Sequence, residues 1–249
     1  MISDNIAVCN SEIHEPAIGQ RPLPTLLALL PLIIVLEAAL VLNGSDLSAA
    51  RVLAHEHIGE AFHFFGLAPQ VVLHSTGLAV VVILLVWHGL TGKSWRITIR
   101  QPAQLFFEGC IATAPLLAMA AFLGTMHTTS LAATTGSMPL SGSDAVVLAI
   151  GAGLSEELLF RMVGIAALHW LFVDLFKWSA VTGTTLAVIA TAAAFTMYHD
   201  PASLPATSTI FIAASGLYLG VLFVMRGFAV AVIAHAGYDV VVFLDQLRA

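Results

Sequence analysis

Two adjacent glutamates and an arginine lie inside a strongly apolar part of this sequence. Glu156, Glu157 and Arg161 fall in the stretch SEELLFR, within a hydrophobic run from Asp144 to about Phe176. An ionised side chain at bilayer depth costs roughly 3 kcal/mol or more, so it is normally kept where it faces protein or a water-filled cavity. We therefore interpret this stretch first as a functional site.

The spacing of these three residues divides them into a pair and a single carboxylate. Glu157 and Arg161 are four residues apart, so they share a helix face and can form an ion pair. Glu156 is rotated about 100° from Glu157 around the helix axis. We expect Glu156 to point toward partners of its own and to be available as a general acid or base.

Two histidines farther along the chain could complete such a site. Phe195 and His199 are four residues apart, as are His235 and Asp239. A histidine beside a carboxylate can share a proton and orient a water, and a second histidine, held by Asp239, could donate to a developing oxyanion. These groups suffice for amide hydrolysis without a covalent intermediate, and Glu156, His199 and His235 would also suffice as zinc ligands.

Each feature alone also has a purely structural interpretation. His199 precedes Asp200-Pro201 and could simply end a helix, and His235 with Asp239 could form a hydrogen bond between helices. The glutamate pair with its arginine is harder to explain without a function. Their occurrence together favours a site.

Three motifs carry a resemblance to a known family. EELLFR, FTMYH and HAGYD resemble the EExxxR, FxxxH and HxxxN or HxxxD motifs of the CPBP (ABI) family of intramembrane proteases, which includes the Ras-converting type of CAAX prenyl protease. The order of the three motifs is the same, and the resemblance covers the chain from about Asp144 to its C-terminus.

The resemblance implies a glutamic endopeptidase that cleaves its substrate at or within the membrane. Carried over to this sequence, Glu156 and His199 activate the attacking water, and His235 and Asp239 serve the oxyanion side. Supporting roles fall to Glu157, Arg161 and Phe195.

The sequence departs from the prenyl-protease branch at two places. Asp239 stands where that branch has Asn, and FRM follows the glutamates in place of FRG. An ionised aspartate would repel an oxyanion, so we expect Asp239 to orient His235. A prenylated C-terminus, a bacteriocin-like leader and a C-terminal sorting helix remain alternative substrates.

The composition indicates an integral membrane protein. The 249 residues are 59% hydrophobic and 10% charged, with a mean hydropathy of +0.94, whereas soluble domains carry about 25% charged residues. The thinly spread net charge of −6 argues against nucleic acid as a partner. The two cysteines, Cys9 and Cys110, form no metal-binding spacing, and no HExxH motif is present.

About seven membrane-spanning helices are predicted, because a span needs roughly 20 apolar residues. The fold class is thus an all-α polytopic bundle with an intramembrane catalytic cavity. The fourth span is long, so it should be tilted or broken near Gly164. The candidate spans cover about 24–42, 71–90, 103–126, 144–176, 180–199, 207–225 and 228–247.

Three parts of the chain are expected. A polar tail (1–21) precedes accessory helices (22–143), which include an interfacial amphipathic helix at about 46–65. The catalytic core occupies 144–249. Lys93, Arg96 and Arg100 share one connector, which places that connector and the N-terminus in the cytoplasm.

This topology puts His199 near the outer face and His235 nearer the inner face, so a shared site requires offset helices. We expect a multi-pass protein of the bacterial inner membrane that cleaves a membrane-associated protein or peptide without a cofactor. The alternatives are a zinc-dependent protease with the same residues, or a non-proteolytic protein such as a proton-coupled transporter or an immunity or scaffold factor.

Overall fold

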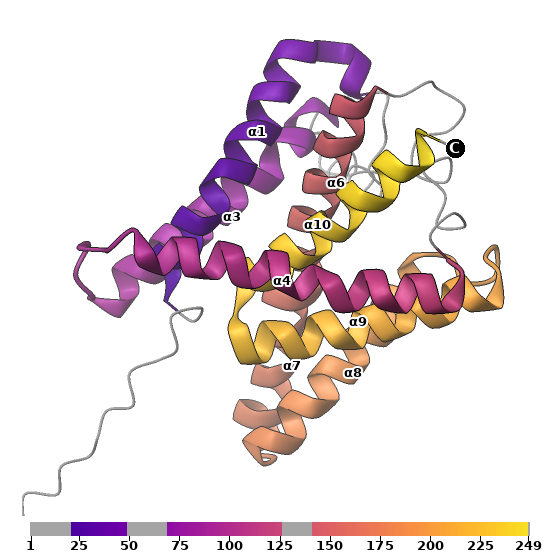
Figure 1. Ribbon diagram of the computed structural model, residues 1–249. Helices are drawn as coiled ribbons and strands as arrows, with labels where there is room; N and C mark the ends of the chain where they lie inside the picture. The colour runs from indigo at the N-terminus through magenta and orange to yellow at the C-terminus, as the bar shows by residue number, and fades with distance from the viewer. Residues whose placement is uncertain (1–20, 49–68, 126–140, 249) are drawn as a thin grey trace, which may run out of the picture.

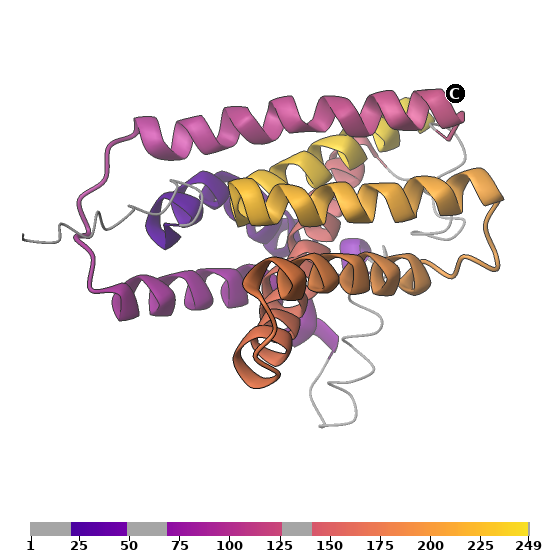
Figure 2. The ribbon, with the colours of Figure 1, turned by 90° about the horizontal axis from the view of Figure 1, so that it is seen from below.

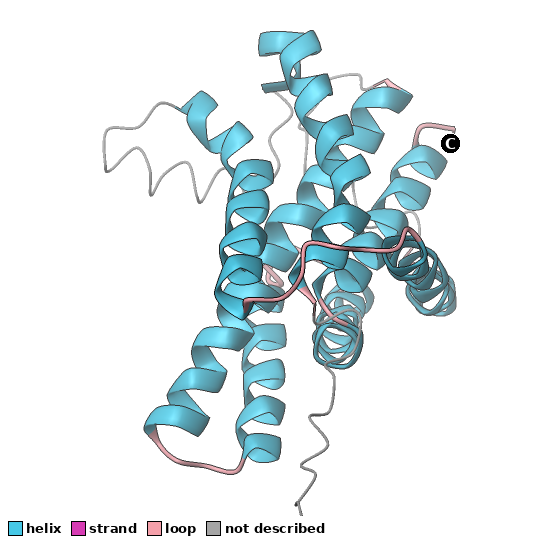
Figure 3. Cartoon of the chain, turned by 90° about the vertical axis from the view of Figure 1, so that its left-hand side faces the viewer, coloured by secondary structure: helices cyan, strands magenta, loops and turns pink. Residues whose placement is uncertain are grey.

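The described part of the chain is helical throughout. A computed structural model of the protein describes residues 21–48, 69–125 and 141–248, which contain no strand (Figure 1, Figure 3). The predicted tail and most of the predicted interfacial helix at 46–65 lie outside these residues. In chain order the elements are α1 (Pro22–Ser48), α3 (Pro69–Thr91), α4 (Arg100–Leu123), α6 (Gly142–Glu156), η2 (Glu157–Ile165), α7 (Ala166–His169), η3 (Trp170–Leu175), α8 (Ala180–Tyr198), α9 (Ala206–Arg226) and α10 (Phe228–Gln246).

The predicted membrane bundle of about seven helices is confirmed. Among the described residues, six helical segments are long and apolar enough to cross a bilayer, and α3 contributes a shorter apolar stretch. The six are Pro22–Leu42, Arg100–Leu123, Gly142–Leu175, Ala180–Tyr198, Ala206–Arg226 and Phe228–Gln246.

The first predicted span, about 24–42, is confirmed, because the apolar span covers Pro22–Leu42, and the helix α1 itself continues to Ser48. The fourth span is not broken at Gly164, because residues 142–175 form one continuous helical rod of 34 residues. Within this rod, η2 and η3 have π-helical hydrogen bonding, and the intervening α7 has α-helical hydrogen bonding.

The 142–175 rod lies across α4, α9 and α8. In Figure 1, α4, α9 and α8 run across the page and the rod descends steeply past them, and Figure 2 shows the rod foreshortened near the centre. Helix α10 packs mainly against α4 and α6. Nearly every side chain from Phe228 to Ala236 is buried, which makes α10 the central helix of the bundle.

Small residues allow these helices to approach closely, as is common in membranes. A Cβ added at Gly153 of α6 would lie 2.9 Å from the backbone nitrogen of Ala236 on α10. A Cβ at Gly109 of α4 would lie 2.5 Å from the Cβ of Ile233. The helix that carries His235 is therefore held between α6 and α4.

Candidate active site

The two glutamates lie where the rod changes its helical geometry. Glu156 is the last residue of α6, and Glu157 is the first residue of the π-helical segment η2. Wider π turns inside α-helices are rare and are frequent at functional sites. Both side chains are buried, Glu157 completely.

The predicted ion pair between Glu157 and Arg161 is present. Arg161 Nε lies 3.3 Å from Glu157 Oε2, and the side chains are 1% and 0% exposed. Arg161 also donates through Nη2 to the carbonyl oxygen of Gly216 on α9 at 3.3 Å. The guanidinium lies 4.5 Å from the centre of the Phe195 ring, within the range of a cation–π contact.

His235 contacts both glutamates. Its Nδ1 lies 2.8 Å from Glu157 Oε1, and its Nε2 lies 3.8 Å from Glu156 Oε2. Asp239 Oδ2 approaches the same Nε2 at 3.4 Å. The sequence predicted that Asp239 orients His235. In the structure, Asp239 lies beside Nε2 of this ring, and Glu157 lies beside Nδ1.

His199 approaches Glu156 from α8. Its Nε2 lies 3.8 Å from Glu156 Oε2, and its Nδ1 lies 2.8 Å from the backbone oxygen of Phe195. A carbonyl oxygen only accepts, so Nδ1 carries the proton and, in the neutral ring, Nε2 presents its lone pair toward Glu156. The His199 side chain is 24% exposed, which gives this end of the site an opening.

His199 and His235 were expected at different depths in the membrane, and the offset of their helices brings them together. His199 caps the C-terminal end of α8, whereas His235 lies two turns inside α10. Both ring nitrogens nevertheless lie 3.8 Å from one carboxylate oxygen. That separation exceeds a direct hydrogen bond, and a water placed beside the two groups could bond to both.

Aromatic rings that sequence reasoning missed enclose this cluster. Phe160 packs edge-to-face on Phe195 and on Tyr198, with centroid separations of 5.3 and 5.4 Å. Tyr198 in turn contacts the His199 ring at 5.4 Å. Phe160 lies in EELLFR and Tyr198 precedes His199, so their positions inside the motifs were the available signal.

A second missed group lies on α4, outside all three motifs. Thr113 Oγ1 lies 3.4 Å from the backbone oxygen of Ala234, the residue before His235, and Tyr218 donates to the backbone oxygen of Ala112 at 2.8 Å. Arg226, which ends α9, forms an ion pair with Glu108. No spacing rule in the sequence links α4 to these partners.

His169 lies apart from the site. It follows Arg161 by eight residues on the same rod, and its Nδ1 contacts Thr184 Oγ1 at 2.9 Å. Thr184 lies fifteen residues before His199, or about 22 Å along α8.

Within residues 21–48, 69–125 and 141–248, no group of three or more His, Cys, Asp or Glu side chains is arranged to hold a metal ion. The cluster brings together three carboxyl groups, two imidazoles and one guanidinium. Such a set can share protons and bind a water.

A comparison with known protein families matches the segment that holds this cluster. Residues 138–241 match the family model described as Type II CAAX prenyl endopeptidase Rce1-like. This segment, which we call the Rce1-like segment, is similar to that family. No curated protein and no solved structure matches the chain.

The Rce1-like segment contains every predicted site residue, from Glu156 to Asp239, and leaves out α1, α3 and α4. The matched model describes a prenyl endopeptidase, and the match covers less than half of the chain. The family resemblance that the motifs carry is therefore confirmed.

Proposed function

We propose that this protein is an intramembrane endopeptidase in which Glu156 and His199 activate a water molecule. The observation that carries the proposal is the convergence on one oxygen: the Nε2 atoms of His199 and His235 each lie 3.8 Å from Glu156 Oε2. These residues come from α8, α10 and α6. No other role explains so directly why three helices direct ionisable groups to one buried point.

In the proposed reaction, a water between Glu156 and His199 adds to the carbonyl carbon of the scissile peptide bond. Its proton passes to the Glu156 carboxylate, with His199 Nε2 accepting a hydrogen bond from the water. The tetrahedral intermediate then collapses, the C–N bond breaks, and Glu156 returns the proton to the leaving amine nitrogen. Atoms and charges balance without a covalent enzyme intermediate.

We assign the oxyanion side to His235. Its Nδ1 is 2.8 Å from Glu157 Oε1, so Nδ1 donates there and only a doubly protonated ring has Nε2 free to donate as well. Carboxylates of Glu156, Glu157 and Asp239 surround this ring. They support the charged imidazolium that donation to an oxyanion requires.

The proposed substrate is a membrane-associated protein or peptide, and the proposed location is the inner membrane of a bacterium. Asp239 occupies the position that is Asn in the prenyl-protease branch. The proposal therefore does not require a prenylated substrate. It also requires no bound metal, so we expect activity to survive prolonged treatment with EDTA and to be independent of added zinc.

The test compares membranes of cells that express the wild-type protein or the Glu156→Gln variant. New peptide termini, measured by mass spectrometry of membrane proteins, should appear with the wild type and be absent with the variant at equal protein abundance. Identical termini in the two samples would contradict the proposal. A transporter would instead show solute flux in proteoliposomes, lost in Glu156→Gln, without any new termini.

A further inference from the structure

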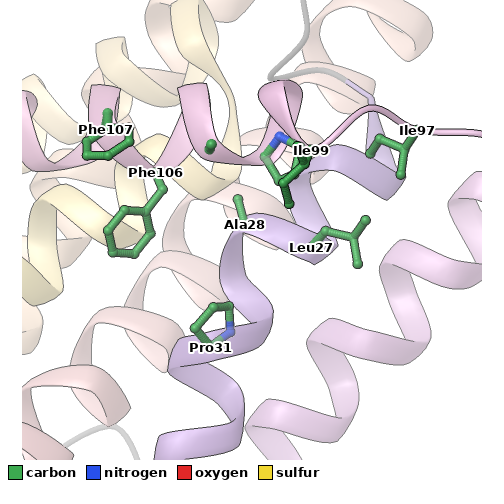
Figure 4. A pocket seen from close by; sticks show the side chains of 9 residues that line it. Leu27, Ala28, Pro31, Ile97, Ile99, Phe106 and Phe107 are labelled. Carbon is green, nitrogen blue, oxygen red and sulfur yellow. The ribbon is translucent and has the colours of Figure 1, made fainter.

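An apolar groove lies on the face of α1 and α4, outside the Rce1-like segment. It encloses a volume of about 570 Å³ between α1, the 92–99 connector and the start of α4. Figure 4 shows Leu27, Ala28 and Pro31 on α1 facing Phe106 of α4, with Ile97 and Ile99 closing one end. Its nine lining residues are Leu27, Ala28, Pro31, Ile97, Ile99, Pro102, Ala103, Phe106 and Phe107.

The groove is open to the surroundings of the bundle. Ile99 and Phe107 are 81% and 65% exposed, which in a membrane protein means contact with lipid. From Pro102 to Phe107 the groove follows six residues of α4, or about 8 Å. Its size falls in the range of small-molecule sites, about 300–1,000 Å³, and its shape and lining suit a hydrocarbon chain.

One end of the groove is bordered by positive charge that no described acidic residue neutralises. Arg96 adjoins Ile97 and Arg100 adjoins Ile99, so the chain brings a cation to each of the two isoleucines that close that end. Arg96, Arg100 and the nearby Lys93 are exposed, and none of them forms an ion pair with a described residue.

The acidic residue closest to this end along α4 does not neutralise these cations. Glu108 is held by Arg226, with Nε donating to Oε2 at 3.2 Å. The connector lies on the face that the distribution of Lys and Arg assigns to the cytoplasm. Anionic headgroups are enriched on cytoplasmic leaflets and attract cations beside a span.

We propose that this groove binds an anionic phospholipid. One acyl chain lies between α1 and α4 against Phe106 and Phe107, and the headgroup phosphate is bound by Arg96 and Arg100. The apolar lining accounts for the chain, and the pair of unpaired arginines accounts for selection of a negative headgroup. This site is separate from the Glu156 cluster and does not depend on proteolysis.

The test measures lipid binding and not cleavage. Full-length protein in detergent is titrated with dioleoyl phosphatidylglycerol or dioleoyl phosphatidylcholine, and bound lipid is counted by native mass spectrometry. Phosphatidylglycerol should bind at least about tenfold more tightly, since each cation near a headgroup favours binding severalfold. Equal affinity for the two lipids would overturn the proposal, as would binding of neither.

Two pairs of variants separate the headgroup from the chain. Arg96→Gln with Arg100→Gln should weaken phosphatidylglycerol roughly tenfold or more and leave phosphatidylcholine unchanged. Lys177→Gln, which removes an exposed cation from the 176–179 connector, should change neither. A similar loss in Lys177→Gln would show general charge attraction and overturn the site.

The groove itself is blocked by Ala103→Phe, which should weaken both lipids. Its control is Ala121→Phe, an exposed position near the other end of α4. Elution as one monodisperse species confirms that each variant is folded. Unchanged phosphatidylglycerol binding in Ala103→Phe would place the lipid elsewhere and overturn the proposal.

Discussion

Glu156 and Glu157 are neighbours in sequence, yet their carboxylates have different surroundings. Glu157 has the Arg161 guanidinium at 3.3 Å and His235 Nδ1 at 2.8 Å. Glu156 faces two imidazole Nε2 atoms at 3.8 Å and no guanidinium among the described residues. The first arrangement stabilises a buried charge, whereas the second leaves an oxygen available to a reactant.

This difference predicts unequal effects on stability for two matched variants that both lose activity. Glu157→Gln leaves the Arg161 charge buried without its partner, and breaking such a pair costs about 3–5 kcal/mol. We expect a clear fall in the thermal unfolding temperature of the purified protein and loss of activity. Glu156→Gln should abolish cleavage with little change in unfolding temperature. Equal stability of the two variants would contradict the assignment.

His199 should matter for the rate and little for the fold. Its side chain is 24% exposed and its contact with Glu156 is longer than a direct hydrogen bond. Because general acid–base groups contribute about 10²–10⁴-fold, we expect His199→Gln to lower kcat by at least a hundredfold. KM and the unfolding temperature should stay close to wild type. A variant with normal kcat would remove His199 from the mechanism.

For single residues, the sequence predicted side-chain contacts within one helix, but it gave little information on contacts between helices. Four-residue spacing predicted the Glu157–Arg161 ion pair, which is present. The contact from Glu157 to His235 spans 78 residues, and periodicity holds no information on such distances. Because Glu156 and Glu157 are rotated about 100° from each other around the helix, we expected them to have different partners. Both instead reach the His235 ring, Glu157 at Nδ1 and Glu156 at Nε2.

Helix α4 packs beside the site, and its sequence alone does not predict this. It lies outside the Rce1-like segment, yet it packs along α10 and contacts the residues just before His235. Ile233, two residues before His235, packs directly on Gly109. We infer that α4 supports the position of His235.

A pair of glycine variants tests this support. A Cβ at Gly109 would lie 2.5 Å from Ile233, whereas nothing lies within 4 Å of one at Gly89 of α3. Gly109→Ala should force α4 and α10 apart at a cost of about 1–3 kcal/mol, lowering both unfolding temperature and kcat. Gly89→Ala should be neutral or stabilising, since alanine favours helix over glycine by about 1 kcal/mol. Indistinguishable variants would show that the interface adapts.

The 142–175 rod shows that the presence of a helix was easier to predict than its course. Its apolar length predicted a span that is tilted or broken near Gly164. The chain instead keeps hydrogen bonding through π-helical segments. Gly164 serves close packing, because an added Cβ would lie 3.1 Å from Thr191 Cγ2 on α8. In a sequence, a glycine at a bend in a helix cannot be distinguished from a glycine at a close contact between helices.

For the whole molecule, the hydrophobic runs were sufficient to predict the class and roughly the number of helices. They could not predict that the rod lies across its neighbours (Figure 1, Figure 2), because the crossing depends on contacts between segments far apart in the chain. That crossing is what brings Glu156 to the end of α8 and to the middle of α10 at once.

The orientation of the molecule in the membrane is the remaining prediction at this scale. The joint between α3 and α4 and the joint between α9 and α10 lie on the same side of the bundle in Figure 1 and Figure 2. The loop after α8 lies at the opposite side. Lys93, Arg96, Arg100 and Arg226 all belong to the first side, which the positive-inside rule places in the cytoplasm.

Single cysteines report this orientation directly. Cys9→Ala and Cys110→Ala remove the two native thiols, and Ser94→Cys or Ser203→Cys adds one at an exposed connector position on each side. A membrane-impermeant maleimide applied to intact cells should label Ser203→Cys and spare Ser94→Cys until the cells are opened. Labelling of Ser94→Cys alone would invert the molecule, and the end of α8 that holds His199 would then face the cytoplasm. Labelling of both would mean that the two connectors lie on the same face of the membrane. That result would contradict the arrangement, because three successive spans (α4, the 142–175 rod and α8) separate the two connectors.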